Sequence, residues 1–364
     1  MLLVIFGAGA SFDSVHGLPA TMILRAIRGT YGVMEDDRPP LANQLFDDRP
    51  DFVSAMSAFP ACLALIPSLR KHNVVVEREL ARIQEQADHY PRVHQELASI
   101  RYYLHFALWR LQERWMRHHR GITNYAALLR EIDRWRLSFN QKVCFVTFNY
   151  DTMLDTELER LLGVQFQKVS DYSQESYALI KPHGSINWGR EVDGGLMGSL
   201  GEQSSLKLIE AAGGLQISDR YRIVPGAPMC RMPNESTIVF PALSIPVVNK
   251  VKYSCPETHI QLLYEILPKV TKIVTVGWRA TELEFLELLR TRLSGKPSLM
   301  IVSGNQAGAD ETHQNLVGDV DRMAAQPYGT FIPGALKTGP WETVAAGFTG
   351  LINDLDTLEK FLRS

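Results

Sequence analysis

Short apolar runs that stop abruptly at polar residues constrain the fold of this chain most strongly. Residues 143–148 form such a run and lead directly into Asn149 and Asp151. Residues 179–182 lead into His183 in a similar way. Open α/β sheets bind ligands at the carboxyl ends of their strands. The sequence therefore predicts an α/β fold with a small-molecule site at the ends of these two runs.

The first residues of the chain add a third strand and a glycine turn. Residues 2–6 are apolar and β-branched, and the turn that follows contains Gly7, Ala8, Gly9 and Ser11. Backbone N–H groups of such a turn, placed at a helix N-terminus, suit a pyrophosphate. The full dinucleotide fingerprint has a third glycine where this chain has Phe12, and it has an acidic residue about 20 residues later, which is missing here. The turn is therefore either a pyrophosphate site or only a tight turn.

Composition places the chain among ordinary globular proteins. It has 364 residues, of which 45% are hydrophobic and 21% charged, and its net charge of −2 gives no global basic field to attract nucleic acid. The four cysteines are scattered, which favours a reducing compartment over a disulfide framework. The run 2–6 is too short for a signal peptide, and no apolar run approaches the roughly 20 residues of a membrane span. These features predict a soluble, cytoplasmic protein without a membrane contact.

The middle of the chain is predicted to be helical. Apolar residues recur at spacings of three and four, which is typical of one buried helix face; they are Leu97, Ile100, Leu104, Leu108, Leu111 and Trp115. We therefore expect one domain spanning 1–364, a Rossmann-like, mostly parallel sheet with a helical module inserted at 53–140.

The motifs occur in an order that resembles the sirtuin superfamily. They are the glycine turn with Gly17, Leu18 and Pro19 after it, then Thr147, Asn149 and Asp151, then His183 and Gly184, and finally Gly277 and Asn305 in the places that meet the adenosine. The resemblance covers most of residues 1–305. It implies that NAD is bound by Gly7, Ala8, Gly9, Ser11, Gly277 and Asn305, and that Asn149, Asp151 and His183 are catalytic.

The chain also departs from familiar deacylase sirtuins. Those enzymes hold a structural zinc with two Cys-x-x-Cys pairs, whereas no two of Cys62, Cys144, Cys230 and Cys255 are close in sequence. We therefore expect no metal. The chain is more similar to the bacterial sirtuin-like NADase effectors of anti-phage systems, which share Asn-Tyr-Asp and a stretch that here runs from Pro241 to Lys250.

That resemblance implies an NAD glycohydrolase that releases nicotinamide and ADP-ribose, with NAD as its substrate. It further implies a role in antiviral defence, activation within a complex, a homo-oligomer, and as partner a HerA-like DNA-translocating ATPase or an Argonaute-like protein. Two other functions remain open. One is an NAD-dependent protein deacylase or ADP-ribosyltransferase, and the other is a non-catalytic nucleotide-binding subunit of a nucleic-acid-sensing complex.

Each candidate catalytic residue also has a structural interpretation. Asn149 is a residue type that caps helices, and Asp151 suits the first turn of the helix predicted at 151–162. His183 is either a general base on a ribose hydroxyl or water, or a buried structural histidine. The sequence leaves these alternatives open.

Overall fold

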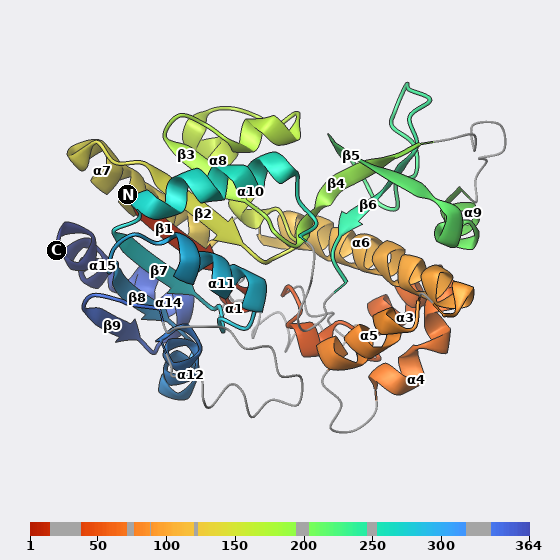
Figure 1. The fold of residues 1–364 in the computed structure, drawn as a ribbon, viewed down its shortest axis with the longest axis horizontal. Coiled ribbons are helices and arrows are strands. Elements are labelled where there is room, and N and C mark those ends of the chain that lie inside the picture. Colours follow the sequence, from red (N-terminus) through yellow and green to blue (C-terminus); the bar gives the residue numbers. More distant parts are fainter. Residues whose placement is uncertain are drawn as a thin grey trace.

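The computed structural model describes residues 1–14, 38–70, 76–87, 89–119, 123–193, 204–245, 253–317 and 336–364. Its centre is a six-stranded parallel sheet with the order β3-β2-β1-β7-β8-β9 (Figure 1). The strands are β1 (Leu2–Phe6), β2 (Val143–Thr147), β3 (Tyr177–Ile180), β7 (Lys272–Val276), β8 (Ser298–Val302) and β9 (Trp341–Val344).

The strand register confirms the predicted α/β class. β1 pairs in parallel with β2 on one side and β7 on the other, with Val4 opposite both Phe145 and Val274. Numbered along the chain within this sheet, the order is third, second, first, fourth, fifth and sixth, which is the Rossmann order. β1 and β2 are buried along their whole length, as expected for strands covered on both faces.

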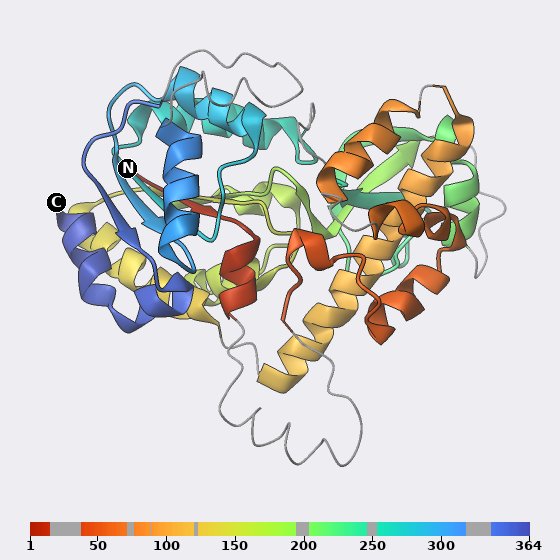
Figure 2. The same ribbon diagram turned by 90° about the horizontal axis from the view of Figure 1, so that it is seen from below.

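Helices cover both faces of the parallel sheet. In Figure 2, α10 and α11 lie on one side of it and α7 and α15 on the other. The helices of this layer set are α1 (Ala8–Ser14), α7 (Asn124–Phe139), α8 (Met153–Leu162), α10 (Glu257–Ile266), α11 (Leu283–Arg292), α12 (Gln306–Val317), α14 (Gly347–Asn353) and α15 (Leu355–Arg363). Short 3-10 turns occur at η3 (Val169–Tyr172) and η6 (Leu267–Lys269).

A second hydrophobic core lies beside the first. It joins the helices of residues 42–119 to an antiparallel sheet with the order β5-β4-β6. The strands are β4 (Gly184–Asp193), β5 (Gln216–Ile223) and β6 (Val239–Leu243), and the helical elements are η1 (Ala42–Gln44), α3 (Pro50–Ser57), η2 (Pro60–Ala64), α4 (Ile66–Leu69), α5 (Val76–Glu85), α6 (Pro91–His119), α9 (Ser204–Glu210) and η5 (Ala212–Gly214). The division into one domain with an insertion at 53–140 stays a prediction.

The long helix α6 connects the two cores. The apolar face predicted from the sequence is confirmed, since Leu97 to Leu111 are buried in the second core and Trp115 is buried in the first. Figure 2 shows α6 running from the lower middle of the molecule into the half that holds α3, α4 and α5. Neither α6 nor any other helix in the described ranges is long and apolar enough to cross a membrane.

We expect the protein to lose stability in mild acid because it contains two buried histidines. Burial lowers the pKa of His105 and of His259 to about 4, although Nε2 of each lies within hydrogen-bond distance of a backbone carbonyl. The unfolded chain, with histidine pKa values near 6.5, then binds more protons than the folded chain between pH 6.5 and 4. The free energy of unfolding should be constant above pH 6.5 and should fall below it, by up to about 1.4 kcal/mol per pH unit for each histidine.

Urea unfolding at pH 7.5, 6.0 and 5.0 measures this slope. The double variant His105→Gln, His259→Gln should lose most of it. An equal slope in the wild type and in the double variant would show that other groups control acid stability.

Candidate functional site

The residues predicted to form the site all follow strands of the parallel sheet. The glycine turn follows β1, Asn149 and Asp151 follow β2, His183 follows β3, Gly277 follows β7, and Asn305 follows β8. Because these strands are parallel, their carboxyl ends share one edge of the sheet. β1 and β7 are neighbours at the point where the strand order reverses, which is where such sheets bind ligands.

The glycines after β1 and β7 allow the two loops to touch. A Cβ on Gly7 would lie 2.5 Å from the carbonyl oxygen of Gly277, and a Cβ on Gly277 would lie 2.4 Å from the Ala10 nitrogen. Gly277 also has a φ of +57°, which favours glycine. Gly9 N donates to Gly277 O at 3.2 Å. The glycines thus have a packing role at this edge, and pyrophosphate binding by the turn stays a prediction.

Two of the quoted motif segments lie outside the described residues. These are 17–19, which continue the glycine turn in sequence, and 246–250, which complete the stretch that begins at Pro241.

Asn149 links the loop after β2 to the glycine turn. Its Nδ2 donates to Gly7 O at 3.0 Å and to Ser11 Oγ at 2.8 Å, and it lies 3.4 Å from the hydroxyl of Tyr125. Asn149 therefore does not cap α8, which begins at Met153. The amide nitrogen is occupied by these bonds, while Oδ1 makes no hydrogen bond within the described ranges. That oxygen can accept a hydrogen bond from a ligand hydroxyl or a water molecule.

Asp151 lies two residues further along the same loop and is half-buried. Its Oδ1 accepts a hydrogen bond from the N–H of Met153, the first residue of α8, at 3.0 Å. Asp151 therefore lies just before the helix and not in its first turn, where the predicted range 151–162 places it. Burial raises the pKa of the Asp151 carboxyl, and the nearby Lys181 ammonium, the Ser11 hydroxyl and the Met153 N–H partly oppose that rise. The carboxylate thus lies at the glycine turn beside Ser11.

His183 lies on the other side of the 149–151 loop. Its ring contacts Phe148 edge-on at a centroid distance of 4.9 Å and lies 6.2 Å from the Tyr150 ring. The imidazole is half-buried. The next residue, Gly184, has a φ of +79°, and a Cβ there would lie 1.9 Å from the carbonyl oxygen of Ala242. Glycine is therefore required after His183 because β6 passes directly against the backbone.

Asn305 has a local structural role. Its side chain is exposed and its Oδ1 accepts a hydrogen bond from Gly308 N at 2.8 Å, in the first turn of α12. This is the bond of a helix cap. No hydrogen bond between Asn305 and the other candidate site residues occurs in the described structure, and its contact with adenosine stays a prediction.

A buried ion pair beneath the site was missed at the sequence level. Lys181 is fully buried, and its Nζ lies 2.9 Å from Asp155 Oδ2 and 2.6 Å from the backbone oxygen of Asp151. The Tyr172 hydroxyl donates to Asp155 Oδ1 at 2.7 Å, and Asn187 Nδ2 donates to that hydroxyl at 3.1 Å. Lys181 thereby connects the loop that carries His183 to the loop that carries Asp151. Only its place two residues before His183 was a sequence signal.

Polar residues of α6 support the same two loops. Gln112 forms a pair of hydrogen bonds with Thr152, at 2.5 Å from Nε2 to the hydroxyl and at 2.9 Å from the Thr152 N–H to Oε1. One face of α6 also carries His105, whose Nε2 lies 2.8 Å from the Ile186 oxygen, and Ile186 N donates to Tyr150 O. The second core thus holds the 149–152 loop from the side opposite the glycine turn.

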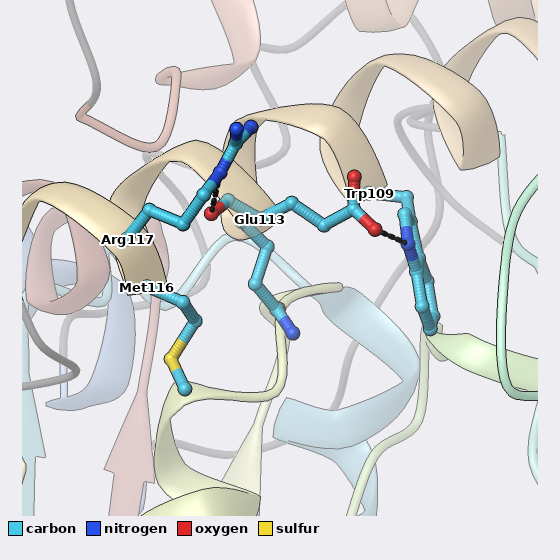
Figure 3. A pocket seen from close by; sticks show the side chains of 5 residues that line it. Trp109, Glu113, Met116 and Arg117 are labelled. Carbon is cyan, nitrogen blue, oxygen red and sulfur yellow. Dashed lines mark hydrogen bonds between the residues drawn. The ribbon is translucent and has the colours of Figure 1, made fainter.

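A surface pocket of about 490 Å³ adjoins this contact on α6 (Figure 3). Trp109 Nε1 donates to Glu113 Oε1 at 3.1 Å, and Arg117 Nε donates to the Glu113 backbone oxygen. Gln112 and Met116 complete the lining. None of the predicted site residues lines this pocket, so it is a neighbour of the candidate site and not part of it.

The cysteines lead to a prediction about metal content. All four are buried, and burial raises the thiol pKa to about 11 for Cys62 and Cys230 and to about 12 for Cys144 and Cys255. Zinc binds the thiolate, and the described residues contain no group of three or more potential metal ligands. Elemental analysis of the purified protein should therefore find far less than one zinc per chain. One zinc per chain, together with unfolding on chelation, would contradict this expectation.

Comparisons with known proteins give only distant matches. No family model matches the chain, and no curated protein matches it. Among solved structures it is similar to a Sir2 homolog–NAD complex, with 12% identity and a TM-score of 0.36 over 100% of this chain and 88% of that chain. It is also similar to a mutant Sir2 homologue in complex with ADP-ribose, with 11% identity and a TM-score of 0.35 over 100% of this chain and 91% of that chain. TM-scores this low do not establish a common fold, so the architecture above stands on strand order and register.

Proposed function

We propose that the protein hydrolyses the bond between nicotinamide and ribose in NAD and releases nicotinamide and ADP-ribose. The observation that carries this proposal is the position of Asn149, whose amide is bonded to the glycine turn. The next residue, Tyr150, faces the other way, toward His183. One short loop therefore lies between a turn suited to pyrophosphate and an imidazole suited to proton transfer.

The reaction needs charge stabilisation and orientation more than acid catalysis. The glycosidic bond breaks through an oxocarbenium-like transition state, here with a neutral nicotinamide as leaving group. In the proposal, the turn at 7–11 holds the pyrophosphate. Oδ1 of Asn149 orients a ribose hydroxyl or the attacking water, because it accepts no hydrogen bond from the described part of the chain.

Asp151 and His183 supply the two remaining roles. The Asp151 carboxylate, held by the N–H of Met153, stabilises the positive charge that grows on the ribose or binds the carboxamide of nicotinamide. His183 is half-buried, so a substrate can reach it, and it acts as general base on a ribose hydroxyl or on water. Gly277 packs against the turn and so sets its distance from the sheet.

Further parts of the proposal concern the cell. They are cytoplasmic localisation, NAD depletion in antiviral defence, assembly into a homo-oligomer, and control by a HerA-like ATPase or an Argonaute-like partner. They follow from the motif resemblance alone. An enzyme that depletes NAD has to be restrained, which gives the proposed assembly a purpose.

Incubation of the full-length protein with NAD tests the proposal. We expect nicotinamide and ADP-ribose in equal amounts without any peptide. Nicotinamide release only in the presence of an acylated peptide would show a deacylase, and ADP-ribose attached to protein would show a transferase. No release, either alone or after assembly with the proposed partners, would favour the non-catalytic nucleotide-binding subunit.

A further inference from the structure

Arg101 on α6 is a half-buried cation without a carboxylate partner among the described residues. Its Nε donates to the backbone oxygen of Leu243 at 3.3 Å, and no acidic side chain pairs with its guanidinium in the described ranges. Arginine is almost never buried without a partner, because removing its charge from water is costly. Burial lowers the pKa of Arg101 to about 10, so the side chain is still protonated at neutral pH.

Part of the Arg101 side chain is accessible to solvent. Burial is the largest influence on its pKa, yet the side chain keeps part of its surface accessible. Tyr150, Asp151 and His183 are half-buried in the same way. The two Nη atoms of Arg101 form no hydrogen bond with the described residues, so their four N–H groups can donate to a ligand.

Backbone contacts place Arg101 on the His183 side of the candidate site. Leu243, which accepts from Arg101, is paired with Gly184 across β4 and β6. The next residue, Ser244, donates through its N–H to His183 O at 2.9 Å and accepts from the Tyr150 hydroxyl at 2.9 Å. Arg101, Tyr150 and His183 therefore surround one short stretch of β6 and its end.

This position is separate from the glycine turn. Asn149 faces the turn, whereas Tyr150 faces Ser244 at the end of β6. An anion beside Arg101 would thus be a different group from one held by residues 7–11. We infer that Arg101 forms an oxyanion subsite on the His183 side of the candidate site, which takes the phosphate or carboxylate group of a small molecule.

The planar fork of arginine suits either oxyanion, because both accept two parallel hydrogen bonds. The subsite would lie next to the cleaved bond only if the proposed function is correct. The binding of an oxyanion at Arg101 does not depend on the proposed function. An acceptor, product or effector that carries such a group would be bound at the face of the site opposite the glycine turn.

Chemical labelling of arginine tests the inference on the unaltered full-length protein. Phenylglyoxal is applied in sodium chloride, sodium phosphate or sodium acetate of equal ionic strength, and the labelled residues are mapped by peptide mass. Arg101 should be labelled in chloride and protected at least about threefold by phosphate, by acetate, or by both. The exposed Arg110, nine residues further on the same helix, should be labelled equally in all three. The more protective anion identifies the class of ligand.

Thermal unfolding of variants gives a second readout. Phosphate or acetate should raise the midpoint of the wild type and of Arg110→Met by about 1–3 °C more than it raises that of Arg101→Met, because the general effect of each salt on folding is common to all three proteins. Arg101→Lys, which keeps the charge, should show a smaller rise than the wild type. Equal labelling of Arg101 in all three salts, or no labelling at all, would overturn the subsite. Protection by phosphate in a protein that does not cleave NAD, either alone or after assembly with the proposed partners, would retain the subsite and reject the hydrolase.

Discussion

Replacing His183 with alanine should reduce nicotinamide release by about 10²–10⁴-fold, the usual contribution of a general base. The side chain is half-buried against Phe148 and Tyr150, so its loss removes the imidazole from an accessible part of the site and leaves both cores intact. The variant should therefore fold. The assay measures nicotinamide from NAD at saturating substrate, with circular dichroism as the control for folding.

A control variant at another histidine shows whether the loss of activity is specific to His183. His89 is exposed at the turn after α5, and His89→Ala should cleave NAD at the rate of the wild type. Full activity in a folded His183→Ala protein would show that the imidazole is structural. The resemblance of the His183 and Gly184 pair to a catalytic motif would then be misleading, because β6 alone explains the glycine.

Lys181→Met should have the largest effect on stability. The substitution leaves the Asp155 carboxylate buried with only the Tyr172 hydroxyl as a described partner. Breaking a buried ion pair in this way costs about 3–5 kcal/mol of unfolding free energy. Urea unfolding at neutral pH measures the loss. A cost below about 1 kcal/mol would show that the pair is weaker than its burial indicates.

The double variant Lys181→Met, Asp155→Leu distinguishes stability from positioning. It removes both charges and should recover most of the lost stability. It should not recover NAD cleavage, because the hydrogen bond from Lys181 to the Asp151 backbone oxygen is still absent. Lys181 also opposes the rise in the pKa of Asp151, so the acid limb of the pH–rate profile should move to higher pH in both variants. An unchanged profile would limit Lys181 to a structural role.

The centre of the parallel sheet could be predicted because its strands are continuous apolar runs, whereas the edge strand β9, with the sequence Trp-Glu-Thr-Val, could not. β1 and β2 are buried on both faces, which produces the pattern that the sequence shows. The long helix was equally predictable, since one face of α6 is apolar from Leu97 to Trp115. Asn149 and His183 could be placed at the strand ends for the same reason, because a polar residue directly after a buried strand lies at the edge of the sheet.

The antiparallel sheet and the support of the site could not be predicted in this way. β4 mixes glycines with charged residues, and β6 contains Pro241, which an edge strand tolerates because it need not donate to a neighbour. The ion pair of Lys181 could not be predicted, because its partner Asp155 is 26 residues away in sequence. Gln112 and Arg101 lie on α6. The spacing of apolar residues along this helix shows which face is buried, but it does not show which residues the polar side chains contact.

Because the Asn149 side chain forms hydrogen bonds within the protein, its substitution should affect stability as well as activity. The amide is buried and tied to Gly7 and Ser11, so Asn149→Ala removes hydrogen bonds within the protein as well as the free Oδ1 acceptor. We expect a stability cost of about 1–3 kcal/mol in addition to the loss of function. The variant has to be compared with the wild type at a temperature where both are folded.

The central claim is that the loops after β1, β2, β3 and β7 form one site for NAD. Calorimetric titration of NAD onto the His183→Ala protein tests it most directly, because binding is then measured with little turnover. We expect saturable binding of one NAD per chain, weakened at least about tenfold by adding Asn149→Ala, the loss expected for one hydrogen bond. A folded His183→Ala protein that binds no NAD, or binds it equally well with and without Asn149, would contradict the account.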